Sequence, residues 1–320
     1  MRAGERRVGR RATLPRARGR AARRPCRRLR AHRQRPQGSR HRDAARSGGP
    51  RGGCERERRA RRAAVSFRAR VPATSANVGP GFDSFALALP LVAEFEMRPA
   101  RSWSVTIDGD GAGVPTGEDN LFVVAARATA AAARQSLPAQ QVTQRSAIPT
   151  GRGLGSSAAA IVGGCVAANA ALGGPLDRRT LLRVATDVEG HPDNVAGALQ
   201  GGFTLTLPTD LGPVASRLPF PSIWRVCLFV PSSPLSTEVA RAVLSRTVTR
   251  EDAVFNLAHA AALVAAILRA DGTLLALAMH DRLHQPARLR LVPALDEIAA
   301  AARSAGAFGA ALSGAGPSVI

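Results

Sequence analysis

The most informative stretch of the chain covers residues 149–158 and reads Pro149-Thr150-Gly151-Arg152-Gly153-Leu154-Gly155-Ser156-Ser157-Ala158. Its alternating glycines allow positive-φ conformations and let the backbone approach a ligand without an intervening Cβ. The two serines stand where an alanine-rich helix is expected to begin, so free N–H groups and the positive end of the helix dipole face the loop. The stretch therefore predicts an anion site, with phosphate as its natural occupant.

This loop differs from the two commonest phosphate-binding patterns. No Gly-Lys-Ser/Thr follows at the spacing of a Walker P-loop, and the glycines do not fit the dinucleotide pattern Gly-x-Gly-x-x-Gly. The structural alternative is a glycine-rich turn that only leads into a buried helix. Whether the segment binds phosphate or is only a structural turn has to be decided from the remainder of the sequence.

Composition bounds the class of protein. The 320 residues are 45% hydrophobic, enough for about two domains with real cores. The net charge of +22 is concentrated at the start: residues 1–64 hold 24 arginines and four acidic residues, whereas 65–320 hold 21 arginines and 19 acidic residues. The near-neutral remainder and the low aromatic content argue against a nucleic-acid-binding protein.

The arginine-rich leader, residues 1–64, has almost no large apolar residues and is expected to be disordered. It fits neither a secretory signal nor a transit peptide. Three interpretations remain: an RNA- or DNA-binding arm, a solvated tail, or upstream sequence translated from a GC-rich genome. We favour the third, with the native chain starting at Val65.

From Ser66 onward the sequence alternates between strand and helix patterns. Strands are expected at 67–71, 85–96, 103–108, 142–148, 201–207 and 225–230, and helices at 122–134, 157–172, 176–188, 236–244, 251–269, 274–283 and 293–305. A proline-rich connection over 208–221 suggests a domain boundary. The apolar run 256–268 is too short for a bilayer, so no membrane segment is predicted. The scattered cysteines indicate reduced thiols and a cytoplasmic protein.

Two further polar segments are candidates for chemistry. Asn77 and Asp83 stand in a Gly/Pro-rich loop directly after the first strand, where short polar groups either contact a ligand or serve as turn and cap residues. Glu189 and His191 follow a helix; a carboxylate near a phosphate site can hold Mg²⁺, although a surface acid at a helix end is the commoner case.

Arginines and histidines in the last third give weaker indications. Arg241 and Arg288 have guanidinium groups that suit a carboxylate or phosphate, though helix arginines usually face solvent. His280 and His284 are four residues apart, but no further ligand is evident, so we discount a zinc site.

In combination these segments resemble the GHMP kinase superfamily. The resemblance rests on residues 72–83, 153–158, 189–194 and 313–318, which read PATSANVGPGFD, GLGSSA, EGHPDN and SGAGPS. It covers 66–320 in motif order. The first and third segments match most specifically the members that phosphorylate homoserine.

The resemblance implies a mixed α/β (α+β) fold with two domains. Residues 65–213 would form a domain like ribosomal protein S5 domain 2 that binds ATP, and residues 214–320 a ferredoxin-like domain, with the active site between them. Relatives continue beyond the position matching Ile320, so we expect the second domain to be truncated here.

The resemblance also assigns site residues. The ATP phosphates would lie on residues 151–158, with Pro149 also in the cofactor site and Asn120 near the adenine. Mg²⁺ would be held by Glu189 with a serine, Ser157 being preferred. Five residues match the pocket for L-homoserine: Asn77, Asp83, His191, Arg241 and Arg288. Asp83 can pair the substrate ammonium, and the arginines its carboxylate.

The expected reaction is ATP-dependent phosphorylation of the homoserine hydroxyl, giving O-phospho-L-homoserine for threonine biosynthesis. Because the chain has no lysine, an Asp–Lys pair is excluded, and we name no general base. Another small-molecule GHMP kinase, such as mevalonate kinase, is the alternative, and a nucleic-acid-binding protein acting through the leader is the remote one. A homodimer is compatible with all of these interpretations.

Overall fold

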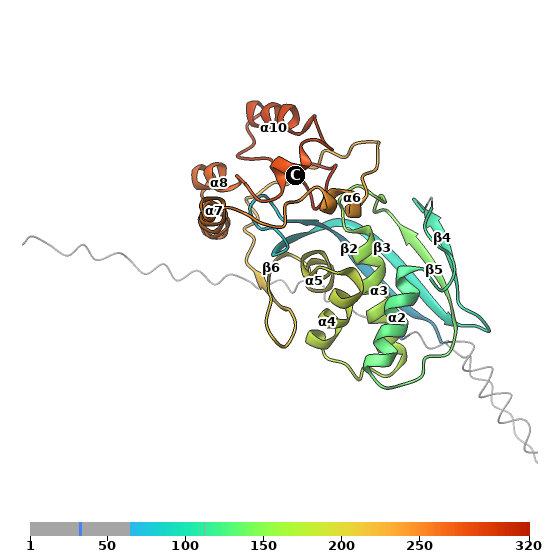
Figure 1. Ribbon diagram of the computed structural model, residues 1–320. Helices are drawn as coiled ribbons and strands as arrows, with labels where there is room; N and C mark the ends of the chain where they lie inside the picture. The colour runs from blue at the N-terminus through green and yellow to red at the C-terminus, as the bar shows by residue number, and fades with distance from the viewer. Residues whose placement is uncertain (1–31, 34–64, 112) are drawn as a thin grey trace, which may run out of the picture.

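The computed structural model describes residues 32–33, 65–111 and 113–320 (Figure 1). The predictions made for the arginine-rich leader therefore lie almost entirely outside the described residues. The described chain has an α/β part built on one sheet, followed by a mostly helical part.

The first part is organised around a twisted sheet whose centre is one long strand. Strand β3 (Phe85–Pro99) pairs antiparallel with β2 (Phe67–Ala76) on one edge. On its other edge it pairs with β5 (Gln140–Ser146) near its end and with β6 (Phe203–Leu207) near its start. The remaining strands are β1 (His32–Arg33) beside β2, β4 (Ser104–Gly109) parallel to β5, and β7 (Val214–Leu218) beside β6.

Four helices cover one face of this sheet in Figure 1: α2 (Leu121–Ala132), α3 (Ser156–Ala171), α4 (Arg178–Glu189) and α5 (Pro192–Gln200). Helix α3 is the buried one, as its small apolar residues predicted. A Cβ on Gly163 would come within 2.7 Å of the Phe95 ring, so the helix lies close on the sheet because this position has no side chain. The main core therefore sits between α3 and the sheet.

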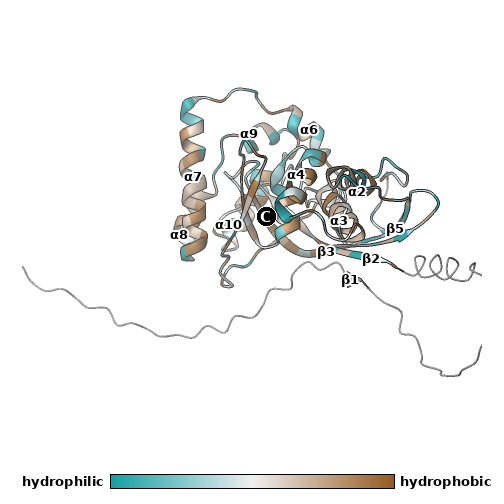
Figure 2. Ribbon diagram, turned by 90° about the horizontal axis from the view of Figure 1, so that it is seen from below, coloured by the Kyte–Doolittle hydropathy of each residue, from teal (hydrophilic) through white to brown (hydrophobic). Residues whose placement is uncertain are grey.

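The second part contains α6 (Thr237–Ala242), α7 (Arg250–Arg269), α8 (Gly272–Ala278), α9 (Gln285–Arg288) and α10 (Leu295–Ser304). Figure 2 shows α7 as a long helix on the side of the molecule away from β5. A second core joins the two parts, since Leu263 and Ile267 of α7 pack with Phe85, Leu87 and Phe203 of the sheet.

Several expectations about local structure were wrong or incomplete. The helix expected at 274–283 is α8, which ends at Ala278. The strand expected at 225–230 is reduced to a bridge between Phe229 and Val319, because only that pair exchanges backbone hydrogen bonds, of 2.9 and 3.0 Å. Helix α5 lies where the chain was expected to be a loop. Strand β7 starts at Val214 and pairs with β6, so it continues the first sheet beyond residue 213; the division into 65–213 and 214–320 stays a prediction.

Helix α7 is also long and apolar enough to cross a membrane, judged by length and composition alone. Within the described residues its Leu263, Ala266 and Ile267 are buried in the protein. Only 22% of its 18-residue apolar window is buried within the described residues, so burial does not account for most of its apolar surface.

Candidate active site

The glycine-rich segment leads into α3 in a conformation that leaves the helix start open. Gly151, Gly153 and Gly155 all have positive φ, and Gly155 is the N-cap of α3 with no side-chain hydrogen bond across the cap. A Cβ on Gly155 would collide with the Thr74 hydroxyl, and one on Gly153 with the Ser313 carbonyl oxygen. The glycines thus let the loop fit tightly between β2 and the loop at Ser313 while the N–H groups of α3 remain available.

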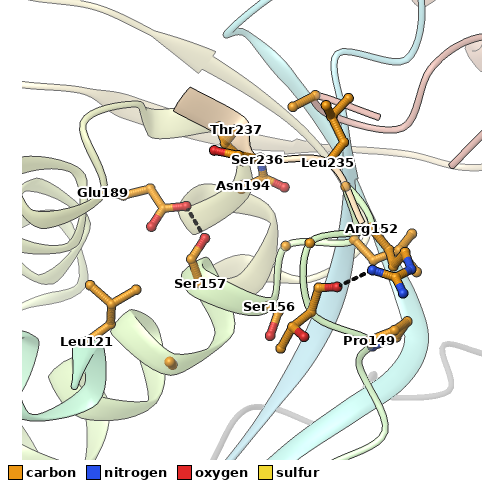
Figure 3. A pocket seen from close by; sticks show the side chains of 18 of the residues that line it. Leu121, Pro149, Arg152, Ser156, Ser157, Glu189, Asn194, Leu235, Ser236 and Thr237 are labelled. Atoms are coloured by element: carbon orange, nitrogen blue, oxygen red, sulfur yellow. Dashed lines mark hydrogen bonds between the residues drawn. The ribbon is translucent and has the colours of Figure 1, made fainter. Parts of the chain in front are cut away.

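A cavity of about 320 Å³ lies in front of this loop, and Figure 3 shows part of its lining. The structure brings nearly all of the predicted site residues to it: Asn77, Asn120, Pro149, Gly151, Arg152, Gly153, Leu154, Gly155, Ser156, Ser157, Glu189, His191, Arg241 and Arg288. Two predicted residues are not among those that line it. Ala158 is buried inside α3, and Asp83 stands beside the lining residues: it pairs with Arg241, and its carboxylate lies within 4.8 Å of ligand atoms of His191 and Asp193.

The predicted pair Ser157 and Glu189 is in contact. The Ser157 hydroxyl donates a 2.7 Å hydrogen bond to Glu189 Oε1 from the first turn of α3, as the dashed line in Figure 3 marks. Glu189 ends α4, and its side chain is 6% exposed. Burial raises the pKa of this carboxyl, and the hydrogen bond from Ser157 opposes that shift in part. Two hard oxygens thus lie side by side at the cavity wall.

His191 is held between two carboxylates. Its Nδ1 lies 2.8 Å from Asp193 Oδ1, and its Nε2 lies 3.8 Å from Glu189 Oε1. Burial disfavours the imidazolium, but the hydrogen bond and charge of Asp193, with the charge of Glu189, outweigh it, so the pKa of His191 is raised. The ring therefore tends to be cationic at a lower proton concentration than an ordinary histidine.

Asp83 and Arg241 form a bidentate ion pair across the two parts of the chain. Arg241 Nη2 donates to Asp83 Oδ1 at 2.6 Å, and Nη1 donates to Oδ2 at 3.2 Å. About a third of each side chain is exposed. We expected Asp83 to pair a substrate ammonium and Arg241 a carboxylate; here the two groups pair with each other.

Arg288 is the other arginine of the cluster and is almost fully buried. Its Nε donates to the Ala240 carbonyl at 3.0 Å and its Nη1 to the Gly314 carbonyl at 3.2 Å. Burial, together with the nearby charge of Arg241, lowers the pKa of Arg288 to about 10. The guanidinium carbons of Arg241 and Arg288 lie 5.7 and 5.6 Å from the centre of the Phe82 ring, so this ring contacts both cations.

Three predicted side chains are occupied by contacts within the protein. Asn77 donates to the Gly314 carbonyl at 2.8 Å and accepts from the Asp83 amide at 3.0 Å. Asn120 caps α2 through the Phe122 amide and donates to the Pro115 carbonyl.

Arg152 donates to the carbonyls of Thr150, Pro231 and Ser232. At this position the loop therefore offers a ligand its backbone, because the guanidinium is already used to tie the two parts of the chain together.

Several neighbours of the site were not predicted as site residues. Asp193 pairs with His191, and Asn194 accepts a 2.7 Å hydrogen bond from the Thr74 hydroxyl. Both belong to the EGHPDN segment, so a motif-based assignment could have included them. The two histidines that we rejected as zinc ligands make different contacts. The ring of His284 is buried against Phe82, whereas the ring centroid of His280 lies 6.3 Å from that of His259.

Comparison with known proteins identifies the class. The sequence-family model of the GHMP kinase N-terminal domain matches residues 120–202, and the family model of the GHMP kinase C-terminal domain matches residues 263–320. By fold and site the chain is thus a GHMP kinase. The homoserine kinase of Moorella thermoacetica is 44% identical over 252 residues, covering 78% of this chain and 85% of the relative. The chain therefore belongs to the homoserine kinase family.

Further relatives agree with this membership. The homoserine kinase of Deinococcus radiodurans is 46% identical over 255 residues, 79% of this chain and 83% of the relative. The crystal structure of homoserine kinase from Cytophaga hutchinsonii has a TM-score of 0.70 at 32% identity, covering 79% of this chain and 84% of that one. Mevalonate kinase of L. major, at 16% identity and a TM-score of 0.57, shares the fold alone.

Proposed function

We propose that this enzyme phosphorylates the hydroxyl of L-homoserine with ATP, releasing O-phospho-L-homoserine and ADP for threonine biosynthesis. The observation that supports this most is the cavity itself. An open helix start and a glycine loop line one side of it, and Arg241, paired with Asp83, and Arg288 line it as well, in a chain of the homoserine kinase family. A mevalonate substrate has no ammonium for the Asp83 carboxylate.

The phosphates of ATP would lie on the backbone of residues 151–158. The support is electrostatic: the first turn of α3 has free N–H groups and contains no acidic residue to repel an anion. Asn120 stays beside the cavity as the cap of α2 and is proposed to lie near the adenine.

The residues also fit a Mg²⁺ ion. Glu189 and Ser157 present adjacent hard oxygens, and the raised pKa of Glu189 reflects a buried carboxylate that a cation would stabilise. When bound, such an ion supplies charge neutralisation on the transferring phosphoryl group. Glu189, at the end of α4, and Ser157, in the first turn of α3, would hold it.

The acceptor would be positioned by the group around Arg241 and Arg288. Asp83 would bind the substrate ammonium while Arg241 and Arg288 bind the carboxylate, with Asn77 and His191 along the path to the γ-phosphate. Because phosphoryl transfer depends mainly on alignment and charge neutralisation, the chain needs no strong base, and we assign none. The raised pKa of His191 makes its cationic form suited to a phosphate oxygen.

The test is ADP release with homoserine, mevalonate and shikimate compared side by side. We expect turnover only with homoserine, and phosphorylation of mevalonate in its place would refute the proposed substrate. We further propose a cytoplasmic enzyme that acts without a membrane or a nucleic acid and forms a homodimer, to be checked by cell fractionation and by mass in solution.

A further inference from the structure

His284 lies directly behind the proposed acceptor wall and has no assigned role. It precedes α9 and is fully buried. Its ring stacks on Phe82, with centroids 5.3 Å apart and planes 21° apart. Phe82 in turn contacts the guanidinium groups of Arg241 and Arg288, so His284 supports the back of the cluster that would hold the substrate carboxylate.

The partners of His284 determine where its proton resides. Nε2 lies 2.8 Å from the Gly79 carbonyl oxygen, which can only accept, so Nε2 must donate. Nδ1 lies 3.1 Å from Nη1 of Arg288, which can only donate, so Nδ1 must accept. Both contacts are satisfied together only by the neutral ring with its proton on Nε2.

The surrounding charges agree with that assignment. Protonation of His284 to the imidazolium would place a second cation beside the buried Arg288. The carboxylates of Asp281, 3.6 Å from Nε2, and of Asp83 act in the opposite direction and favour the imidazolium. Burial dominates, and the pKa of His284 is lowered. Asp281 is itself occupied, accepting from the backbone amides of Leu283, His284 and Gln285 and from the Asn256 amide.

We propose that His284 is a positioning residue for the acceptor site: as a neutral Nε2–H tautomer it accepts a hydrogen bond from Arg288 and fixes that guanidinium for the substrate carboxylate. The proposal rests on homoserine as substrate. Backbone carbonyls of Ala240 and Gly314 hold Nε and Nη1 of Arg288 at 3.0 and 3.2 Å, and the Nδ1 atom of His284 adds the side-chain contact that completes this orientation.

Two substitutions separate the ring nitrogens. In His284→Asn the side-chain oxygen can take the place of Nδ1 and keep the acceptor for Arg288. In His284→Gln the amide nitrogen can take the place of Nε2 and keep the bond to Gly79, while the acceptor for Arg288 is lost. We expect His284→Gln to raise KM for homoserine about tenfold, since it removes a hydrogen bond to a charged group, and His284→Asn to stay within about threefold of wild type.

The KM for ATP should stay the same in both variants, because Arg288 does not contact the glycine loop in any described hydrogen bond. The matched control is His259→Gln, whose ring Nδ1 contacts only the Phe255 carbonyl on α7 and which should behave as wild type. An unchanged homoserine KM in His284→Gln would overturn the proposal. Equal rises of the homoserine KM in both His284 variants, accompanied by the same loss of thermal stability, would overturn it as well.

A second measurement does not depend on the substrate. Nitrogen-15 NMR of histidine-labelled protein, with the His284 signals assigned by their loss in His284→Gln, should show Nε2 protonated and Nδ1 unprotonated at neutral pH. A protonated Nδ1 would overturn the proposal even if homoserine is turned over. If homoserine is not turned over while the tautomer is as expected, the proposed function fails and the local assignment stands.

Discussion

The two walls of the cavity are built in different ways. The glycine-loop wall comes from one continuous segment, 149–158, and offers mainly backbone N–H groups at the start of α3. The second wall is assembled from distant places: His191, Arg241 and Arg288 line the cavity, and Asp83 stands behind Arg241 as its ion-pair partner. Its side chains are already paired, Asp83 with Arg241 and His191 with Asp193.

This difference explains what each wall can do. Backbone donors fixed by positive-φ glycines bind any phosphate of suitable shape, and this wall therefore supplies a general function. Paired side chains hold charges of both signs at set positions, so they can distinguish a substrate that carries both an ammonium and a carboxylate. Specificity should therefore depend on the second wall, and turnover on the first.

The largest effect should come from Glu189→Gln on the glycine-loop side. Glutamine keeps the size of the side chain and can still accept from the Ser157 hydroxyl, but it removes the negative charge. We expect kcat to fall about 1,000-fold, since several kcal/mol of charge stabilisation would be lost. Steady-state kinetics at saturating ATP measures this.

Glu118→Gln is the control, because the Glu118 side chain is 60% exposed and, within the described residues, its ion pair is with Arg127. A kcat for Glu189→Gln within threefold of wild type would contradict the metal-binding role of Glu189.

The next largest effect should come from Gly155→Ala. The added Cβ would collide with the Thr74 hydroxyl at a residue whose φ is +70°, so the loop must move. We expect kcat/KM to fall about 100-fold, because shifts of about 1 Å in a reacting group have effects of that size.

Gly174→Ala separates backbone strain from displacement of the loop. Gly174 also has positive φ, +80°, but no atom lies within 4 Å of its added Cβ. Both variants should lose about 1 kcal/mol of stability from strain, and only Gly155→Ala should lose activity. Equal activities in the two variants would remove the loop from its proposed place at the phosphates.

The sequence predicted the first wall better than the second for a physical reason. A glycine loop that precedes a helix is a local feature, and Gly151 to Ser157 could be interpreted without knowing the fold. The contacts of Arg288 with Gly314 and of His284 with Gly79 depend instead on tertiary packing, whereas His284 and Arg288 stand four residues apart, a spacing that could have indicated their contact. His284 was considered only as a zinc ligand and was set aside.

The secondary structure shows the same limit. Helix α5 was missed because Pro192, Asp193 and Asn194 were interpreted as a loop, although proline is favoured in the first turn of a helix, where its missing N–H costs nothing. β7 was hidden in the proline-rich connection, and its strand state depends on pairing with β6 rather than on its own residues. The longer elements α3, α4 and α7 have strong patterns and were predicted within about two residues.

A smaller effect, confined to one substrate, should come from Asp83→Asn. This change removes the charge that pairs with Arg241, whose side chain is about a third exposed and whose buried Nε has no hydrogen-bond partner among the described residues. We expect KM for homoserine to rise about 30-fold, since an ionic hydrogen bond to the ammonium would be lost. Stability should change by less than about 1 kcal/mol because a third of each side chain is exposed. A parallel rise in KM for ATP would show that the two walls are not separate in function.

The smallest effect should appear in the pH dependence of Asp193→Asn. Asp193 raises the pKa of His191 in the folded protein, against the opposing effect of burial. A histidine whose pKa is raised on folding contributes stability that is fully present below its unfolded pKa of about 6.5 and is lost as the pH rises through the folded pKa. The wild type should therefore exceed Asp193→Asn in free energy of unfolding by about 1 kcal/mol near pH 6, and this excess should narrow as the solution becomes alkaline. Urea unfolding of both proteins at several pH values measures the difference, and an excess that widens with increasing pH would show that Asp193 acts on His191 in some other way than by stabilising its cation.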